Sequence, residues 1–182
     1  MIKGTYKPKF QKVYDILHNQ IKSDYELGAA VSVELNGEEV INLWGGYTSE
    51  SKEKFWDENT IVNVWSVTKA VTGACIAKLI SDKKLDINEK VSYYWPEYGV
   101  NGKENTKVID FLSHRAGMFG FQGGYPDANW NDWTIYTDSL QSQKPFREPG
   151  SSQGYHAVTF AWLVGELIKR VDGRTVGNYF KD

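Results

Sequence analysis

Two apolar, β-branched runs within residues 29–46, AAVSVELNGEEVINLWGG, are joined by the dipeptide Asn36-Gly37. Asn-Gly tolerates the positive φ angles of a two-residue hairpin turn, so this is the strongest short-range pattern in the chain. No repeating alternation of strands and helices accompanies it, which argues against a parallel sheet. The segment therefore predicts an antiparallel hairpin.

Apolar residues at helical spacing predict helices on both sides of the hairpin. Long helices are expected over residues 9–25, 66–81, 133–142 and 157–171, and shorter ones within residues 86–98 and 106–117. The helix that starts at Ser66 is apolar around most of its circumference, which predicts a largely enclosed, central helix. Residues 61–65 are predicted to be extended. Residues 117–132, rich in Gly, Pro, Asn and aromatic residues, are predicted to form a loop.

The composition narrows the class of protein. With 182 residues, 41% of them hydrophobic, the chain can bury a core and is expected to form one globular domain. Its formal charge of −2 comes from scattered residues, so nucleic acid is not an expected partner. No apolar stretch approaches the ~20 residues that span a bilayer and no signal peptide is visible, so a soluble, cytoplasmic protein is expected. The single Cys75 lies in a small apolar run and is predicted to be a core thiol.

The pattern Ser-x-x-Lys, typical of some acyl-accepting serines, occurs four times, so the context has to select among the copies. Three copies lie in polar connectors or at a helix end and are interpreted as surface: Ser49/Lys52, Ser51/Lys54 and Ser81/Lys84. Ser66 instead begins a mostly apolar helix, where free backbone N–H groups and the helix dipole surround its hydroxyl. Lys69 follows one turn later on the same face.

Two interpretations of Ser66 and Lys69 stay open at this point. Partial burial among Val67, Ala70 and Val71 would disfavour the charged ammonium of Lys69, and could bring its proton within range of chemistry near neutrality. Alternatively, Ser66 is an ordinary N-cap and Lys69 is a surface residue whose stem packs on apolar neighbours.

Residues 150–154, GSSQG, match the G-x-S-x-G nucleophile elbow but lack the strand that must precede it. Residues 146–149 form a turn instead, so the match is interpreted as a coincidental loop. Tyr155 follows directly and leads into the last long predicted helix. Its phenol could exchange a proton with a serine if a cation lowers its pKa, or Tyr155 could be a packed aromatic residue.

The histidines and the aromatic loop give weaker indications. His114 and His156 could form a catalytic set with Asp110 or Asp172, but no pattern fixes them near the serine, and His18 lies in the first predicted helix. Structural or surface roles are therefore preferred, and no metal or cofactor is expected. The aromatic residues after position 117 could line an acyl pocket or pack on one another: Phe119, Phe121, Tyr125, Trp130 and Trp133.

Four blocks of the chain occur in the order and spacing of a known family. They are AAVSVELNGEEVINLWGG, WSVTKAVTGACIAKLISDKKLDINEKVSYYWPEY, VIDFLSHRAGM and REPGSSQGYHAVTFAWLVGELIKRVDGR. Together they resemble the serine β-lactamases and penicillin-binding proteins, and especially the β-lactamase-like carboxylesterases. The resemblance implies an α+β fold of the β-lactamase/transpeptidase type, an antiparallel sheet flanked by helices plus a helical lobe. Residues 1–62 would supply the first helix and strands, and residues 63–182 the mainly helical lobe.

The resemblance also implies residue roles. Ser66 would attack the substrate carbonyl, Lys69 would share or relay its proton, and Tyr155 would act as general base and then as acid towards the leaving group. The Ser66 backbone N–H would be one oxyanion donor. Substrate-binding roles are expected for five further residues: Trp65, Phe119, Phe121, Tyr125 and His156.

Two departures from the family's pattern limit how far the family's activity can be expected of this chain. Many lactam-acting members have Tyr-x-Asn where this chain has Tyr155-His156-Ala157, so ester hydrolysis is expected ahead of β-lactamase or D-amino-acid peptidase activity. The family's last segment, with further strands, a Lys-Thr-Gly-like motif and a second oxyanion N–H, is not found in these 182 residues. The hairpin is therefore expected to lack sheet partners, and the chain alone to be inactive.

The expected partners follow from this interpretation. A small ester or lactam would be the substrate, and a complementing C-terminal chain or a second copy could complete the site. A binding or assembly protein that keeps the same architecture without catalysis is the alternative from another class.

Overall fold

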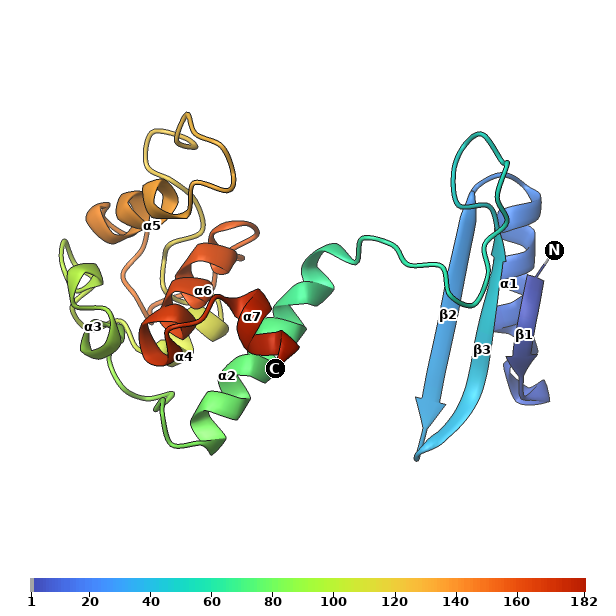
Figure 1. The fold of residues 1–182 in the computed structure, drawn as a ribbon, viewed down its shortest axis with the longest axis horizontal. Coiled ribbons are helices and arrows are strands. Elements are labelled where there is room, and N and C mark those ends of the chain that lie inside the picture. The colour runs from blue at the N-terminus through green and yellow to red at the C-terminus, as the bar shows by residue number, and fades with distance from the viewer. Residues whose placement is uncertain (1) are drawn as a thin grey trace. The chain divides into compact units, whose positions relative to one another are not determined.

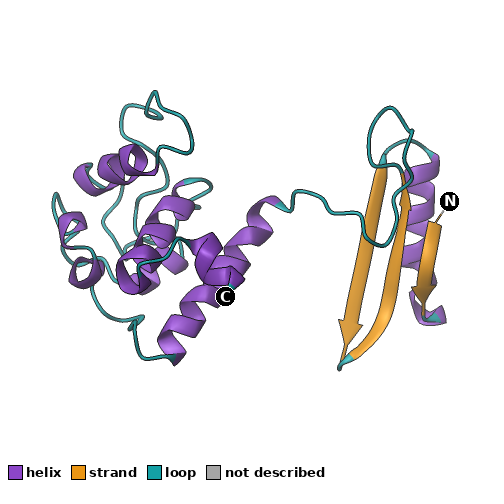
Figure 2. Cartoon of the chain, viewed as in Figure 1, coloured by secondary structure: helices purple, strands orange, loops and turns teal. Residues whose placement is uncertain are grey.

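The computed structural model describes residues 2–182, and the chain divides into two compact units between Asn63 and Val64. The first unit contains a sheet and one long helix, and the second is helical with long loops (Figure 1 and Figure 2).

Three antiparallel strands form the sheet of the first unit, in the order β1-β3-β2. They are β1 (Ile2–Tyr6), β2 (Gly28–Leu35) and β3 (Glu38–Gly46). The predicted hairpin is present, because β2 pairs with β3 and the turn residues Asn36 and Gly37 have φ angles of 53° and 76°. Two positive φ angles are what a type I′ turn requires.

β1 corrects the expectation that the hairpin lacks a further strand. It pairs with β3, with Ile2 opposite Gly45 and Tyr6 opposite Ile41. The sequence did not predict β1, because Gly4 interrupts the alternation of apolar and polar side chains that is typical of a strand. The structure requires glycine there: its φ is 101°, and an added Cβ would lie 1.9 Å from the Asn42 carbonyl oxygen.

The helix α1 (Gln11–Lys22) covers the sheet of the first unit and is shorter at both ends than predicted. A short 3₁₀ helix, η1 (Pro8–Phe10), precedes it. The apolar stripe of α1 packs on one sheet face around four buried residues: Leu17, Val40, Ile41 and Leu43. The predicted amphipathic pattern of this helix is therefore confirmed.

The second unit consists of helices and irregular segments. Its α-helices are α2 (Thr68–Ser81), α3 (Val91–Tyr94), α4 (Val108–Leu112), α5 (Trp133–Ser142), α6 (Thr159–Asp172) and α7 (Val176–Lys181), and its 3₁₀ helices are η2 (Trp65–Val67) and η3 (Pro96–Tyr98). α5 has the predicted bounds, and α6 ends at Gly173, whose φ of 89° gives the predicted left-handed stop. α7 was not predicted.

The predicted extended segment at residues 61–65 is wrong. Residues 61–64 have no regular structure, and Trp65 opens η2. Ile61 and Val62 are exposed, so no packed sheet neighbour favours an extended pairing of these β-branched residues.

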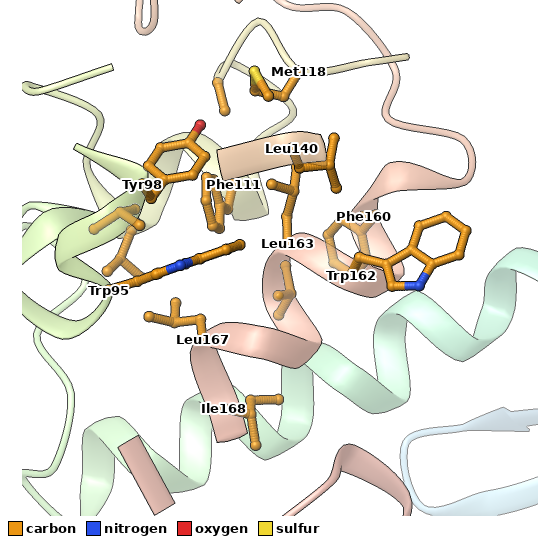
Figure 3. Close-up of a cluster of buried hydrophobic side chains, with 14 of the residues drawn as sticks. Trp95, Tyr98, Phe111, Met118, Leu140, Phe160, Trp162, Leu163, Leu167 and Ile168 are labelled. Carbon is orange, nitrogen blue, oxygen red and sulfur yellow. The ribbon is translucent and has the colours of Figure 1, made fainter. Parts of the chain in front are cut away.

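α6 lies at the centre of the helical unit. Nine of its fourteen residues are buried, the helix contacts α2, α3, α4 and α5, and its buried apolar side chains belong to one continuous core. Figure 3 shows the ring of Trp95 in this core, close to Tyr98, Phe111 and Leu167. The core is therefore built around a helix other than the one that carries Ser66.

α2 corrects a second expectation, because its own unit does not enclose it. Its buried residues lie along one stripe, Thr72, Cys75, Ile76 and Leu79. The opposite side, which includes Val67, Ala70, Ala74 and Ala77, is exposed. Cys75 is the predicted core thiol, and burial raises its pKa.

Candidate active site

Ser66 lies in η2, directly before α2, Lys69 lies in the first turn of α2, and Tyr155 lies in the irregular segment just before α6. Ser66 is two residues before the first residue of α2, so it is not the N-cap of that helix, as one of the two interpretations predicted; the N-cap is Val67. Because α2 packs against α6, the two helix starts come together within one compact unit.

The oxygen of Ser66 is contacted by both other predicted side chains. Lys69 Nζ donates a hydrogen bond to Ser66 Oγ over 3.1 Å. The Tyr155 hydroxyl makes a hydrogen bond to the same oxygen over 2.8 Å, across 89 residues of sequence. Both distances are within the range over which protons transfer between side chains.

Lys69 is held in place by more than Ser66. Its Nζ donates a second hydrogen bond to the Ala157 carbonyl oxygen over 2.8 Å. It also lies 5.0 Å from the ring centre of Tyr155 and 5.5 Å from that of Phe160, within the distance of a cation–π contact. The amine of Lys69 is therefore held between Ser66 Oγ and the ring of Tyr155 and does not extend into solvent.

The pKa of the Tyr155 phenol is lowered from its ordinary value of about 10, first by the hydrogen bond with Ser66 and next by Lys69. Both partners favour the phenolate, because a hydroxyl donor and a nearby cation stabilise negative charge. Tyr155 is 55% exposed, so solvent screens part of this effect. A lowered phenol pKa favours exchange of a proton with Ser66.

Trp65 gives the site an unusual backbone conformation. Its φ is +47°, a left-handed conformation that is an outlier for a bulky residue. Such residues cost on the order of 1–3 kcal/mol and cluster at functional sites. Trp65 directly precedes Ser66, so this conformation sets the direction of the turn that presents the Ser66 hydroxyl.

The five predicted substrate-binding residues fall into different environments. Trp65 is 80% exposed beside Ser66, and Phe119 is half-buried against Gly154, the residue before Tyr155. Tyr125 is exposed and packs on the rings of Phe121 and Trp130. These three residues remain candidates for contact with substrate.

The other two predicted substrate-binding residues, Phe121 and His156, are buried. Phe121 packs in an aromatic cluster with Tyr136 and Trp162, the arrangement that the loop-packing alternative predicts. His156 is fully buried; its Nε2 accepts a hydrogen bond from the Met118 N–H, and burial lowers its pKa to about 4.

The alternative catalytic sets find no support in the geometry. The Asp110 carboxylate accepts a hydrogen bond from the Lys107 backbone at the start of α4, and Asp172 forms ion pairs with Lys84 and Arg174. Lys52 pairs with Asp24, which agrees with the surface interpretation of its Ser-x-x-Lys copy. The GSSQG segment is a turn followed by irregular chain, as predicted.

Gly154 is expected to be intolerant of any side chain. A Cβ at this position would lie 2.7 Å from Phe119 Cδ1, and the Phe119 ring is itself stacked on Phe146. We expect Gly154→Ala to lower the free energy of unfolding by about 1–3 kcal/mol through overpacking, and to displace Tyr155. Urea unfolding measures the first effect. Gly177→Ala is the matched control, because no heavy atom lies within 4 Å of its added Cβ. Equal stability of the two variants would contradict the prediction.

Comparison of the sequence with known proteins gives matches along nearly the whole chain. The sequence model of the family described as Beta-lactamase matches residues 16–182. The chain is 30% identical over 179 residues to the esterase/beta-lactamase LipL of Mycobacterium tuberculosis, a match that covers 98% of this chain and 41% of that protein.

Two solved structures superpose closely. A family VIII carboxylesterase has a TM-score of 0.89 and 35% identity, and the match covers 100% of this chain and 50% of that one. A penicillin-binding protein homologue from Caulobacter crescentus has a TM-score of 0.89 and 33% identity, with 49% of its chain covered. The chain thus spans half or less of the length of these relatives. None of the helices within residues 2–182 has both the length and the apolar character needed to cross a membrane.

Proposed function

We propose, from the premise that the chain belongs to the beta-lactamase family, that Ser66 is the nucleophile of a serine hydrolase that forms an acyl-enzyme. The chain has the β-lactamase/transpeptidase-like fold of its relatives. The observation that carries the proposal is the pair of contacts at Ser66 Oγ, with Lys69 Nζ at 3.1 Å and the Tyr155 oxygen at 2.8 Å. The two compact units would then be parts of one catalytic domain.

The chemical step follows from these contacts. As Ser66 Oγ forms a bond to the substrate carbonyl carbon, its proton passes to the Tyr155 phenolate and the carbonyl electron pair moves onto oxygen. Collapse of the tetrahedral intermediate breaks the bond to the leaving alkoxide, which takes the proton from Tyr155. Water then repeats the sequence on the acyl-serine. Lys69, held by the Ala157 carbonyl and 3.1 Å from Ser66 Oγ, would share or relay the proton of Ser66.

Small carboxylic esters are the proposed substrates. Ala157 offers no side-chain amide to hold an acylamino group, which disfavours lactams that carry one. Two relatives are named for esterase activity, LipL and the family VIII carboxylesterase. Trp65, Phe119 and Tyr125 are the side chains proposed to contact the acyl or alcohol part of the ester.

We further propose that the 182-residue chain does not turn over by itself. Catalysis of acyl transfer depends on oxyanion donors, and loss of one donor typically costs ~2.7–4 kcal/mol of transition-state stabilisation. Within the described residues, only the Ser66 N–H is assigned to this role. A second donor would come from further residues, either in the same polypeptide, in a complementing chain or in a second copy.

Labelling by a fluorophosphonate tests the nucleophile without requiring turnover. One attack by Ser66 Oγ on phosphorus expels fluoride and leaves a stable phosphonyl-serine, so no turnover is needed. We expect one phosphonyl group to attach to the chain at Ser66, detected by intact and peptide mass. Ser66→Ala should stay unlabelled, and Ser81→Ala, which removes the serine of another Ser-x-x-Lys copy, should label normally. Attachment to a different residue, or none at all, would refute the assignment of Ser66.

An ester assay on the same samples tests the second part of the proposal. We expect no steady hydrolysis of p-nitrophenyl acetate by the 182-residue chain above the rate of its Ser66→Ala variant. Turnover that Ser66→Ala abolishes would show that the chain carries a complete site.

A further inference from the structure

His114 contacts the chain on both sides of Tyr155. Its carbonyl oxygen accepts a hydrogen bond from the Gly154 N–H over 2.9 Å, and its Nδ1 accepts one from the His156 N–H over 3.2 Å. One residue therefore binds the backbone immediately before and immediately after the phenol-bearing position.

The His114 ring also packs on Tyr155 itself. The two rings meet edge to face with centroids 4.8 Å apart, and the other neighbours of the imidazole are the rings of His156 and Phe160, each at 5.4 Å. Edge-to-face contacts of this kind restrict ring rotation. The direction of the Tyr155 side chain is thus set by the same residue that holds its backbone.

The backbone of His114 is itself held in an uncommon conformation. Its φ is +61°, in the left-handed region that few side chains adopt, although His and Asn do so more often than most. His114 follows α4, and its N–H donates to the Phe111 carbonyl oxygen. This conformation turns both its carbonyl and its side chain toward the Tyr155 segment.

The hydrogen bond from the His156 N–H to His114 Nδ1 requires a neutral His114 imidazole. Nδ1 accepts a hydrogen bond, so the proton must lie on Nε2. Burial and, to a smaller extent, Lys69 lower the pKa of His114 from its ordinary value of 6.5. The neutral ring is therefore favoured over a wider pH range than for a solvated histidine.

From these contacts we propose that His114 is a positioning residue, which holds the Tyr155 hydroxyl at Ser66 Oγ through the hydrogen bonds of its carbonyl and Nδ1 and the packing of its ring. The importance of this role for chemistry rests on the proposed function, but the geometry can be tested without any activity.

Two substitutions separate the parts of this arrangement. His114→Gly keeps the left-handed backbone and its carbonyl but removes the Nδ1 acceptor and the ring. His114→Asn also tolerates the backbone and places an amide oxygen close to the position of Nδ1, so it is the conservative variant. His18→Asn, in α1 of the other unit, is the control for loss of a histidine.

The direct readout is the pKa of Tyr155, followed by ¹³C NMR of chain labelled at tyrosine Cζ, with the signal assigned by Tyr155→Phe. We expect the lowered pKa of Tyr155 to return toward 10 in His114→Gly and to stay lowered in His114→Asn and His18→Asn. Phosphonylation of Ser66 should slow by about 10²-fold in His114→Gly, the size of effect that a 1 Å displacement can cause, and by much less in His114→Asn.

An unchanged Tyr155 pKa in folded His114→Gly would overturn the inference, whether or not Ser66 is labelled. If wild-type Ser66 is never labelled, the proposed function fails, and the NMR result still decides the role of His114.

Acid titration of the wild-type chain provides a measurement that needs no variant, should His114→Gly not fold. The groups that face His114 are Lys69 from α2 and Tyr155 and His156 from the segment before α6. Protonation of His114 below pH 6.5 turns Nδ1 into a donor opposite the His156 N–H. We expect the His156 amide resonance to shift together with the His114 imidazole resonances. A His156 amide resonance that does not shift as His114 is protonated would overturn the inference.

Discussion

Replacing Tyr155 by Phe is expected to slow the phosphonylation of Ser66 by about 10²–10⁴-fold, the usual contribution of a positioned general base. The substitution removes a single oxygen, the one that lies 2.8 Å from Ser66 Oγ, and leaves the ring that packs on His114. The fold should therefore persist, and the loss should be confined to the labelling rate. Time-resolved intact mass spectrometry measures that rate.

The pH dependence gives this prediction a second, independent signature. A general base acts when deprotonated, so labelling of the wild-type chain should rise with pH through the pKa of Tyr155, which Ser66 and Lys69 hold below 10. In Tyr155→Phe this rise should disappear. Tyr93→Phe, a change at an exposed tyrosine on α3, should behave as wild type. If the Tyr155→Phe chain keeps the wild-type labelling rate and pH profile, the phenol takes no part in the reaction of Ser66.

Replacing Trp95 by Ala is expected to cost about 3–5 kcal/mol of the free energy of unfolding, the range for large aromatic residues deleted from a core. Trp95 is fully buried between η3, α5 and α6. Its ring packs on Tyr98, and its Nε1 donates a hydrogen bond to Gln141 Oε1 over 2.9 Å. The substitution therefore leaves a cavity and also an unpaired acceptor on Gln141.

Urea unfolding followed by circular dichroism at a helix wavelength measures this loss. Trp65→Ala is the matched control, because this tryptophan is 80% exposed and alanine, like tryptophan, has a Cβ at this left-handed position. Its effect on stability should stay below about 1 kcal/mol, as is usual at the surface. Similar losses for Trp95→Ala and Trp65→Ala would mean that the core of the helical unit does not depend on the ring of Trp95.

The elements that could be predicted from the sequence are those that local chemistry specifies. The dipeptide Asn36-Gly37 specifies the hairpin turn, because both residues adopt positive φ angles, and Gly173 specifies the end of α6. The bounds of α5 follow from its own periodicity. β1 was missed because Gly4 breaks the alternation, and only the close approach of β3 explains that glycine.

The candidate site divides in the same way. A spacing of three residues on one helix is enough to place Lys69 beside Ser66, so that half of the site is local. The contact of Tyr155 with Ser66 spans 89 residues, and its prediction depended on the resemblance to a known family, since no period or motif in the sequence links the two positions. Packing of α2 on α6 is what brings them together.

The sequence by itself thus determined the hairpin turn, the limits of α5, the stop of α6 and the pairing of a serine with a lysine, because each depends on residues within a few positions of one another. Only the tertiary structure decided that α2 is exposed along one side, that Phe121 and His156 belong to the interior, and that His114 contacts both sides of Tyr155. The physical reason is that burial and long-range hydrogen bonds depend on which elements pack together, and apolar periodicity shows that a face will be covered without showing what will cover it.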